Sequence, residues 1–218
     1  MNRIAHHGSA TLLDDLSTGV LPEPLAVVAR AHVELCGRCA RKYRIAEERA
    51  ASILDHLGPT TIDDDGLDRC LAQLDGRERL AALPDSEPAS HADAGLPRAV
   101  RDLAPDGLDR LRWDWRGPAR IARLMRGRDD FDLRLLWIRE GAAMPGHRHE
   151  GTEATLVLRG SFNDGGSSFC RGDLALCNED IAHAPRAGAD EPCLCLVASS
   201  GPLVMNGPFG RILGRMLW

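Results

Sequence analysis

The stretch His32–Cys39, with the sequence HVELCGRC, constrains this chain more than any other. His32, Cys36 and Cys39 stand at positions i, i+4 and i+7, a spacing that places all three side chains on one face of a helix. Two thiolates and one imidazole suit Zn²⁺, which prefers tetrahedral nitrogen and sulfur ligation. The motif therefore predicts a zinc site that takes a fourth ligand from elsewhere in the chain. The competing interpretation is a redox Cys-x-x-Cys pair, or two unrelated core cysteines.

The fourth ligand is expected from the tandem pair His6-His7, which lies just before the first predicted helix. The residues alone do not choose between the two histidines. Cys70 and His56 are weaker alternatives, because a core role for one and a surface role for the other explain them better.

Apolar residues at helical spacing predict four short helices near this motif. The expected helices cover residues 9–20, a stretch from Pro24 that breaks at Gly37, residues 39–57, and a stretch that begins near residue 61. Ser9 is expected to cap the first helix and Gly19 to end it. Such a small bundle has a thin core, so a structural zinc would contribute directly to its folding.

The second half of the chain differs from the first in composition and in hydrophobic pattern. Residues 77–98 are rich in Pro, Ala, Ser and charge and are expected to form a linker. After them come short apolar runs separated by turn residues, a pattern typical of a β-sandwich or barrel. The runs are 120–125, 133–138, 155–158, 174–176 and 193–198. We therefore expect an α + β chain of two domains, with a zinc-bound helical bundle over 1–76 and an all-β domain over 99–218.

A second group of metal-binding residue types lies in this β half. His147 and His149 are two residues apart, so they face the same side of a strand, and Glu153 has the same parity. The spacing Gly-x5-His-x-His-x3-Glu-x6-Gly from Gly141 matches the first metal motif of the cupin family, and the stretch ending at His183 resembles the second. This resemblance implies a cupin β-barrel with a four-residue metal site. The implied ligands are His147, His149, Glu153 and His183.

The second cupin motif departs from the family pattern at Asn178, Asp180 and Ala187, where the family usually has Pro, Gly and Asn. These positions shape the turn and leave the ligand set complete. Three imidazoles and one carboxylate suit Zn²⁺ or another divalent transition metal, so the ligand types do not identify this second metal. A cupin that has lost its metal is the alternative.

Cys193 and Cys195 face one way on the strand predicted from the run CLCLVA. Their expected role is packing, as two small buried hydrophobes. A thiol redox switch is the other interpretation, and it requires exposure and thiolate character.

Charge and composition exclude several classes of function. The net charge of −5 and the pI of about 5.9 argue against a direct reader of DNA, which presents a basic face. The sequence has no apolar run of membrane-spanning length and no signal-peptide pattern, so we expect no membrane segment. Seven cysteines, an odd number, favour a reducing cytoplasm over a disulfide-stapled fold.

Taken together, the motifs resemble the ChrR family of zinc-binding anti-sigma factors. The likeness covers nearly the whole chain, from the tandem histidines and HVELCGRC to both cupin motifs and the strand containing Cys193 and Cys195. The resemblance implies that the second histidine of the pair, His7, completes the first zinc site, with His6 as the fallback.

The resemblance also implies a function. The N-terminal helices would bind an extracytoplasmic-function (ECF) sigma factor in a 1:1 complex and hide its RNA-polymerase-binding surfaces. The cupin domain would be the sensor that triggers release under singlet oxygen or organic hydroperoxides. Residues 1–76 carry 8 Arg or Lys against 12 Asp or Glu, and an acidic face suits the basic surfaces of such a partner.

Two other classes of function compete with this one. A metal-dependent cupin dioxygenase would use the His₃Glu site, but it has no need of the N-terminal zinc module. A DNA-binding regulator would combine the zinc module with a cupin effector domain, but the acidic charge counts against it. We therefore expect a cytoplasmic regulator and not an enzyme, with no direct contact to nucleic acid.

Overall fold

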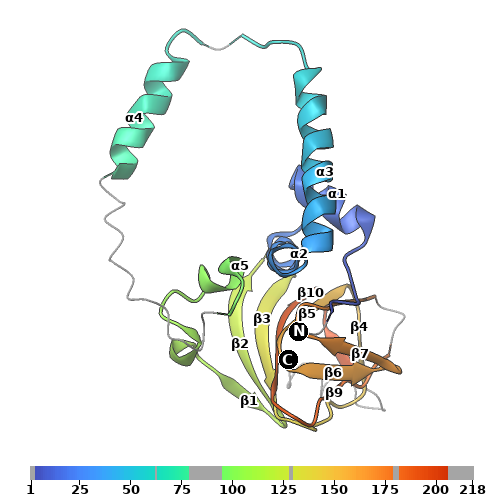
Figure 1. Cartoon of the computed structure of the whole chain (residues 1–218). Helices are drawn as coiled ribbons and strands as arrows, with labels where there is room; N and C mark the ends of the chain where they lie inside the picture. The colour runs from blue at the N-terminus through green and yellow to red at the C-terminus, as the bar shows by residue number, and fades with distance from the viewer. Residues whose placement is uncertain (1–2, 62, 79–94, 128–129, 179–181, 206–218) are drawn as a thin grey trace.

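The computed structural model describes residues 3–61, 63–78, 95–127, 130–178 and 182–205, with helices first and strands afterwards (Figure 1). This order confirms the predicted α + β class. The helices are α1 (Ala10–Thr18), α2 (Glu23–Leu35), α3 (Gly37–Asp55), α4 (Gly66–Glu78), the single turn α5 (Arg98–Arg101) and the 3-10 turn η1 (Leu108–Arg110).

The described strands form three sheets. The largest, in spatial order, contains β1 (Asp114–Arg116), β2 (Ala119–Arg126), β3 (Asp132–Ile138), β10 (Cys193–Ser199), β5 (Glu153–Arg159) and β8 (Leu174–Cys177). A pair is made of β11 (Leu203–Met205) and β4 (His147–His149), and a third sheet of β7 (Ser167–Cys170), β6 (Ser161–Asp164) and β9 (Arg186–Ala187). All five runs predicted as strands are strands, and the expected barrel takes the form of open sheets around a shared interior.

Local sequence sets the ends of the first helix as predicted. The Ser9 hydroxyl accepts a hydrogen bond from the backbone N–H of Leu12 at 3.1 Å and caps α1. Gly19 adopts a φ of 73°, which favours glycine, and its N–H donates to carbonyls of the last turn.

The break between α2 and α3 lies at Cys36, one residue before the predicted Gly37. Cys36 has an extended backbone (φ −110°, ψ 97°), so α2 ends there and α3 begins at the next residue. The expectation of a single helical face is therefore wrong. His32 comes from the last turn of α2, Cys36 from the junction and Cys39 from the first turn of α3.

The core is continuous between the helices and the large sheet. Strand β10 is buried along its whole length, which explains its unbroken apolar sequence. Leu194, Leu196 and Ala198 share a core cluster with α2, whereas Cys193, Cys195 and Val197 belong to a second cluster inside the β half. Figure 1 shows α2 lying against the sheet at β10 and β5.

The end of α3 and the helix α4 differ from the expected four-helix bundle. In α3, residues from Glu47 onward are exposed or half-buried, and in α4 the described side chains after Gly66 are exposed. Figure 1 shows α3 projecting from the body and α4 standing apart. No helix in the described ranges is both long and apolar enough to cross a bilayer.

Some expectations fall outside the described residues. The proposed linker, 77–98, lies mostly within 79–94, and the end of the proposed cupin domain within 206–218. Asp180 of the second cupin motif also lies outside the described part. The domain boundaries therefore stay predictions.

Candidate metal centres

The first candidate centre lies where the N-terminal segment meets the α2–α3 junction. The ligand atoms of His7, His32, Cys36 and Cys39 all lie within 4.8 Å of one another. The Sγ atoms of Cys36 and Cys39 are 3.3 and 3.7 Å from Nδ1 of His7. In a tetrahedral zinc site, bonds of about 2.3 Å to sulfur and about 2.0 Å to nitrogen put such atoms roughly 3.5 Å apart. The cluster thus has the donor set and spacing of an N₂S₂ centre.

His32 is oriented by the β half of the chain. It is fully buried, and its Nδ1–H donates a hydrogen bond to the carbonyl of Gly172 at 2.9 Å. This bond leaves the lone pair on Nε2, which is buried and has no hydrogen-bond partner among the described residues. A buried polar atom without a partner is costly, and a cation held with His7 and the two thiols would satisfy it.

The electrostatics of this centre follow from burial. Burial lowers the pKa of His32, and burial together with nearby Arg38 and Lys42 lowers the pKa of His7, so both imidazoles favour the neutral form that binds metals. Burial and the neighbouring Cys36 raise the pKa of Cys39. Metal binding would therefore release protons from the thiols, which makes affinity dependent on pH.

The alternative ligands lie elsewhere. The ring of His6 stacks on Phe169 with centroids 4.2 Å apart, and its Nε2 is 3.1 Å from the carbonyl of Ser168. Cys70 is exposed on α4, and exposed His56 bonds to the carbonyl of Ser52 at the end of α3. None of these three alternative ligands, His6, Cys70 and His56, joins the cluster.

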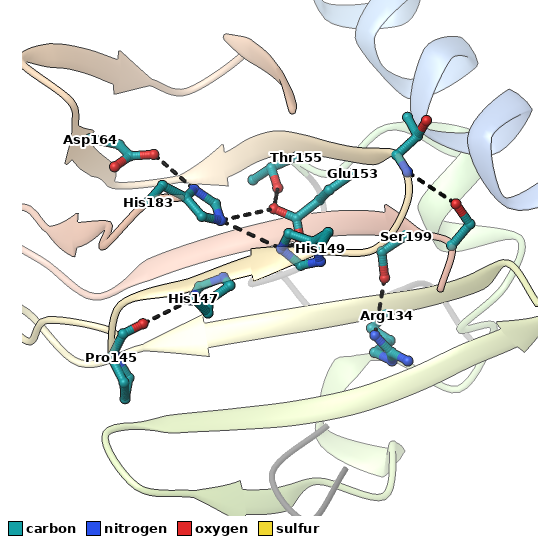
Figure 2. A network of polar contacts seen from close by, with 11 residues as sticks. Arg134, Pro145, His147, His149, Glu153, Thr155, Asp164, His183 and Ser199 are labelled. Carbon is teal, nitrogen blue, oxygen red and sulfur yellow. Dashed lines mark hydrogen bonds and ion pairs between the residues drawn. The ribbon is translucent and has the colours of Figure 1, made fainter. Parts of the chain in front are cut away.

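The second candidate centre lies inside the β half (Figure 2). The ring nitrogens of His147, His149 and His183 gather within 4.8 Å of one another. Glu153, on the first position of β5, brings Oε2 to 3.0 Å from Nε2 of His149 and Oε1 to 4.0 Å from Nε2 of His183. The four residues predicted from the cupin spacing thus converge, with three imidazoles and one carboxylate in contact.

Neighbouring acceptors orient two of these rings. Nδ1–H of His147 donates to the carbonyl of Pro145 at 2.8 Å, and Nδ1–H of His183 donates to Oδ2 of Asp164 at 2.8 Å (Figure 2). Both bonds leave Nε2 as the inward lone pair, the arrangement that metal-binding histidines use. The backbones of His147 and His183 also pair with each other, at 2.9 and 2.8 Å.

The charge states of the second centre suit a cation. Burial by itself would raise the pKa of Glu153, but its hydrogen bond to His149 and the three surrounding imidazoles outweigh burial and lower the pKa. Burial lowers the pKa of His147. The centre thus offers a carboxylate and at least one neutral imidazole, and this donor set fits several divalent transition metals.

A small cavity of about 40 Å³ opens beside this centre. Its walls are mainly apolar, and they include the centre's own His147, Glu153 and His183. A space of this size accommodates a few water molecules at most, on the scale of roughly 10–15 Å³ for each. Cys177 also lines it, and burial followed by the charge of Glu153 raises the pKa of that thiol to about 11.

Cys193 and Cys195 are buried in the core, as the packing interpretation predicts. Their Sγ atoms are 3.5 Å apart, and Cys195 reaches the wall of the cavity. The hydrogen bond with Cys193, followed by burial, raises the pKa of Cys195 well above its usual value, which favours the thiol over the thiolate.

Sequence reasoning missed the residues that support the ligands. Asp164, which holds His183, and Asp173, which contacts the N-terminal segment, were not predicted, and neither was the role of the Gly172 carbonyl as acceptor for His32. Gly172 marks the start of the second cupin motif, and the aspartate after it was the available signal. Its contact with residues about 167 positions earlier has no signature in local spacing.

Comparisons with known proteins identify relatives of this chain. A family model described as a ChrR cupin-like domain matches residues 133–203. The anti-sigma-E factor ChrR of Cereibacter sphaeroides is 32% identical over 216 residues, covering 96% of this chain and 99% of that protein. The crystal structure of Rhodobacter sphaeroides SigE in complex with the anti-sigma ChrR matches with a TM-score of 0.75 and 30% identity, covering 91% of this chain and 100% of the matched one.

Proposed function

This chain belongs to the ChrR family of anti-sigma factors, and we propose that it sequesters an ECF sigma factor in a 1:1 complex. The solved relative is described as a complex of SigE with its anti-sigma factor, which supports the same kind of partner here. Sequestration would keep the sigma factor from RNA polymerase. The chain is thus a regulator of transcription and not an enzyme. Because RNA polymerase is cytoplasmic, the proposed partner implies a cytoplasmic location.

Exposed apolar side chains on α3 and α4 are the observation that carries this proposal. Near the end of α3, Ile53, Leu54 and Leu57 are 64%, 68% and 66% exposed. On α4, Leu67 and Leu71 lie one helical turn apart and are 68% and 48% exposed. Soluble proteins rarely leave such groups of large apolar side chains without a partner, and amphipathic helices commonly dock them in a groove of another protein.

The charge of the same region suits a basic partner. The run Asp63-Asp64-Asp65 lies just before α4, and Asp68 follows in its first turn. Arg69 pairs with two of these carboxylates in exposed salt bridges, which leaves the segment acidic. An acidic segment beside an apolar helix face steers a partner with basic surfaces and fixes its orientation.

We propose that the first centre holds a structural zinc. Its N₂S₂ donor set and closed, buried position are typical of structural zinc sites. Bound there, the ion would join the N-terminal segment to the α2–α3 junction and so fix the direction in which α3 projects. The local apolar cluster consists of buried Leu13, Cys36 and Cys39 with few partners, so the ion would supply much of the stability of this corner.

We propose that the second centre is the sensor and holds zinc or another divalent transition metal. The inducing signal is an oxidant such as singlet oxygen or an organic hydroperoxide. The cavity of about 40 Å³ has room for a molecule of the size of dioxygen, whereas pockets for organic substrates are usually about 300–1,000 Å³. This size favours singlet oxygen over an organic hydroperoxide as the molecule that enters, and it favours a sensing role over a dioxygenase reaction on a larger substrate.

The test is reconstitution with the ECF sigma factor encoded in the same genome. The two chains are co-expressed, purified through a tag on the sigma factor, and sized by light scattering. We expect a 1:1 complex, and loss of sigma-dependent transcription in vitro when this chain is added. Failure to form a stable complex, with transcription unaffected, would contradict the anti-sigma assignment.

A further inference from the structure

The N-terminal segment of the chain is attached to the turn between β7 and β8. Asp173 in this turn is 2% exposed, and its Oδ1 accepts the backbone N–H groups of Ala5 and His6 at 2.7 and 2.8 Å. Its Oδ2 accepts the N–H of Cys170 at 2.8 Å, which closes the turn itself. The N–H of Leu174 donates to the carbonyl of His6 at 3.2 Å. A buried carboxylate thus binds the backbone just before the ligand His7.

The same turn also holds the second imidazole of the first centre. Gly172, directly before the buried carboxylate, accepts the Nδ1–H of His32. Gly172 has a φ of +91°, and a Cβ at this position would lie 2.6 Å from Cδ1 of Ile4. The turn therefore needs glycine for its backbone conformation and for close approach of the N-terminal segment. Adjacent turn residues set both nitrogen donors of the first centre.

The turn leads directly into the wall of the second centre. Strand β8 follows at Leu174 and pairs with β5, where Cys177 lies opposite Glu153. Glu153 contacts two of the three histidines of the second centre. A single four-residue strand therefore separates the support of the first centre from the carboxylate of the second.

We propose that Asp173 is a positioning residue of the first metal centre and that the β7–β8 turn couples the two centres. Asp173 binds no metal itself. It holds the backbone that carries His7 and fixes the carbonyl that orients His32. A shift of β5 and β8 at the second centre moves this turn and loosens the first centre. This coupling rests on the proposed anti-sigma function, and it would give the second centre a way to regulate that function.

Ligand orientation and thermodynamic linkage set the expected size and direction of the change in metal affinity. Removal of a hydrogen-bond partner that orients a ligand typically weakens metal binding by about 10–100-fold. If metal at the second centre changes affinity at the first, then metal at the first must change affinity at the second by the same factor. Both effects are measurable without any sigma factor.

Cobalt titration of the full chain tests the positioning role. Thiolate-to-cobalt charge transfer reports on the first centre alone, because the second has no cysteine ligand. In Asp173→Asn an NH₂ group replaces one carboxylate oxygen, so a donor faces a backbone N–H that previously had an acceptor. We therefore expect cobalt affinity at the first centre to fall at least about tenfold. The matched control is Asp190→Asn, an exposed aspartate in the β half that should leave the titration unchanged. Equal affinities in the two variants would overturn the positioning role.

A milder variant covers the case in which Asp173→Asn does not fold. His6→Ala removes the ring that stacks on Phe169 but keeps both backbone bonds to Asp173. We expect it to weaken cobalt binding at the first centre by less than about tenfold and to speed hydrogen exchange of the Ala5 amide. Unchanged affinity and unchanged exchange would overturn the attachment.

Disruption of the second centre tests the coupling. Glu153→Gln should lower cobalt affinity at the first centre when Asp173 is intact, and should have no further effect when combined with Asp173→Asn. Additive effects, or no effect of Glu153→Gln at the first centre, would overturn the coupling. Binding of the sigma factor is measured separately, so failure of the coupling and failure of the anti-sigma proposal are distinguishable.

Discussion

Replacement of Leu54 and Leu57 by serine should weaken binding of the sigma factor strongly. Leu54 lies in the last turn of α3 and Leu57 two residues beyond its end, and they are 68% and 66% exposed, so about two-thirds of each side chain remains available for burial by a partner. Complete burial of a leucine side chain contributes about 1.5–3 kcal/mol. Two-thirds of that is about 1–2 kcal/mol for each residue, or about 2–4 kcal/mol for the pair.

This loss converts to a large change in affinity. At about 1.4 kcal/mol for each factor of ten, the dissociation constant of the complex should rise roughly 30- to 700-fold. The double variant should keep its fold, because neither side chain belongs to a core cluster.

Titration calorimetry with the purified sigma factor measures the effect, and circular dichroism checks that helix content is unchanged. The matched control is Trp115→Ser on β1, a large apolar residue that is 63% exposed and lies in the β half. It should bind as the unaltered chain does. The proposed docking face would be refuted if the double variant bound within about threefold of the unaltered chain, or if the control lost as much affinity.

Three further outcomes are expected. Cys36→Ser should remove one ligand of the first centre, so metal analysis should find about one metal ion fewer per chain. The cobalt–thiolate absorption should also fall, and full absorption would contradict the assignment of Cys36 as a ligand. Asp164→Asn should lower metal affinity at the second centre by roughly 10–100-fold, measured by competition with a chelator, and any loss at the first centre should be the smaller of the two. Leu156→Ala, at a fully buried position of β5, should destabilise the chain by about 2–5 kcal/mol in urea unfolding followed by tryptophan fluorescence, and a loss below about 1 kcal/mol would show that the site relaxes.

Elements governed by local rules could be predicted from the sequence. The hydroxyl of Ser9 and the left-handed backbone of Gly19 bound α1 as expected. The apolar run 193–198 became a strand because it packs α2 on one face and the β interior on the other. The cupin spacing brought four residues together because strand parity and one cross-strand bridge, between His147 and His183, determine their facing.

Features that depend on distant contacts could not be predicted in this way. The i, i+4, i+7 spacing suggested one helical face and Gly37 suggested the break, but the extended residue is Cys36, and Cys39 of the next helix meets His7 from the distant N-terminal segment. The apolar spacing of α4 suggested a place in a bundle, whereas Leu67 and Leu71 are exposed. Periodicity indicates that a face needs burial, but it does not say whether the chain itself or a partner supplies it.

The two connections between the halves differ in kind, and this difference determines where a signal can act. Helix α2 carries His32 and buries Leu25, Val27 and Val28, which together contribute about 5 kcal/mol or more. The N-terminal segment carries His7 and is held by three hydrogen bonds of its backbone, two to the Asp173 carboxylate at about 1.5–3 kcal/mol each and one to the backbone of Leu174 at about 0.5–1.5 kcal/mol net. Because two of these bonds depend on one carboxylate, a single displacement of the β7–β8 turn can release the segment, whereas the apolar contacts of α2 are spread over several side chains. A change at the second centre that moves β8 would free His7 while His32 stays in the core, and the loss of one ligand would then weaken the metal's hold on the α2–α3 junction.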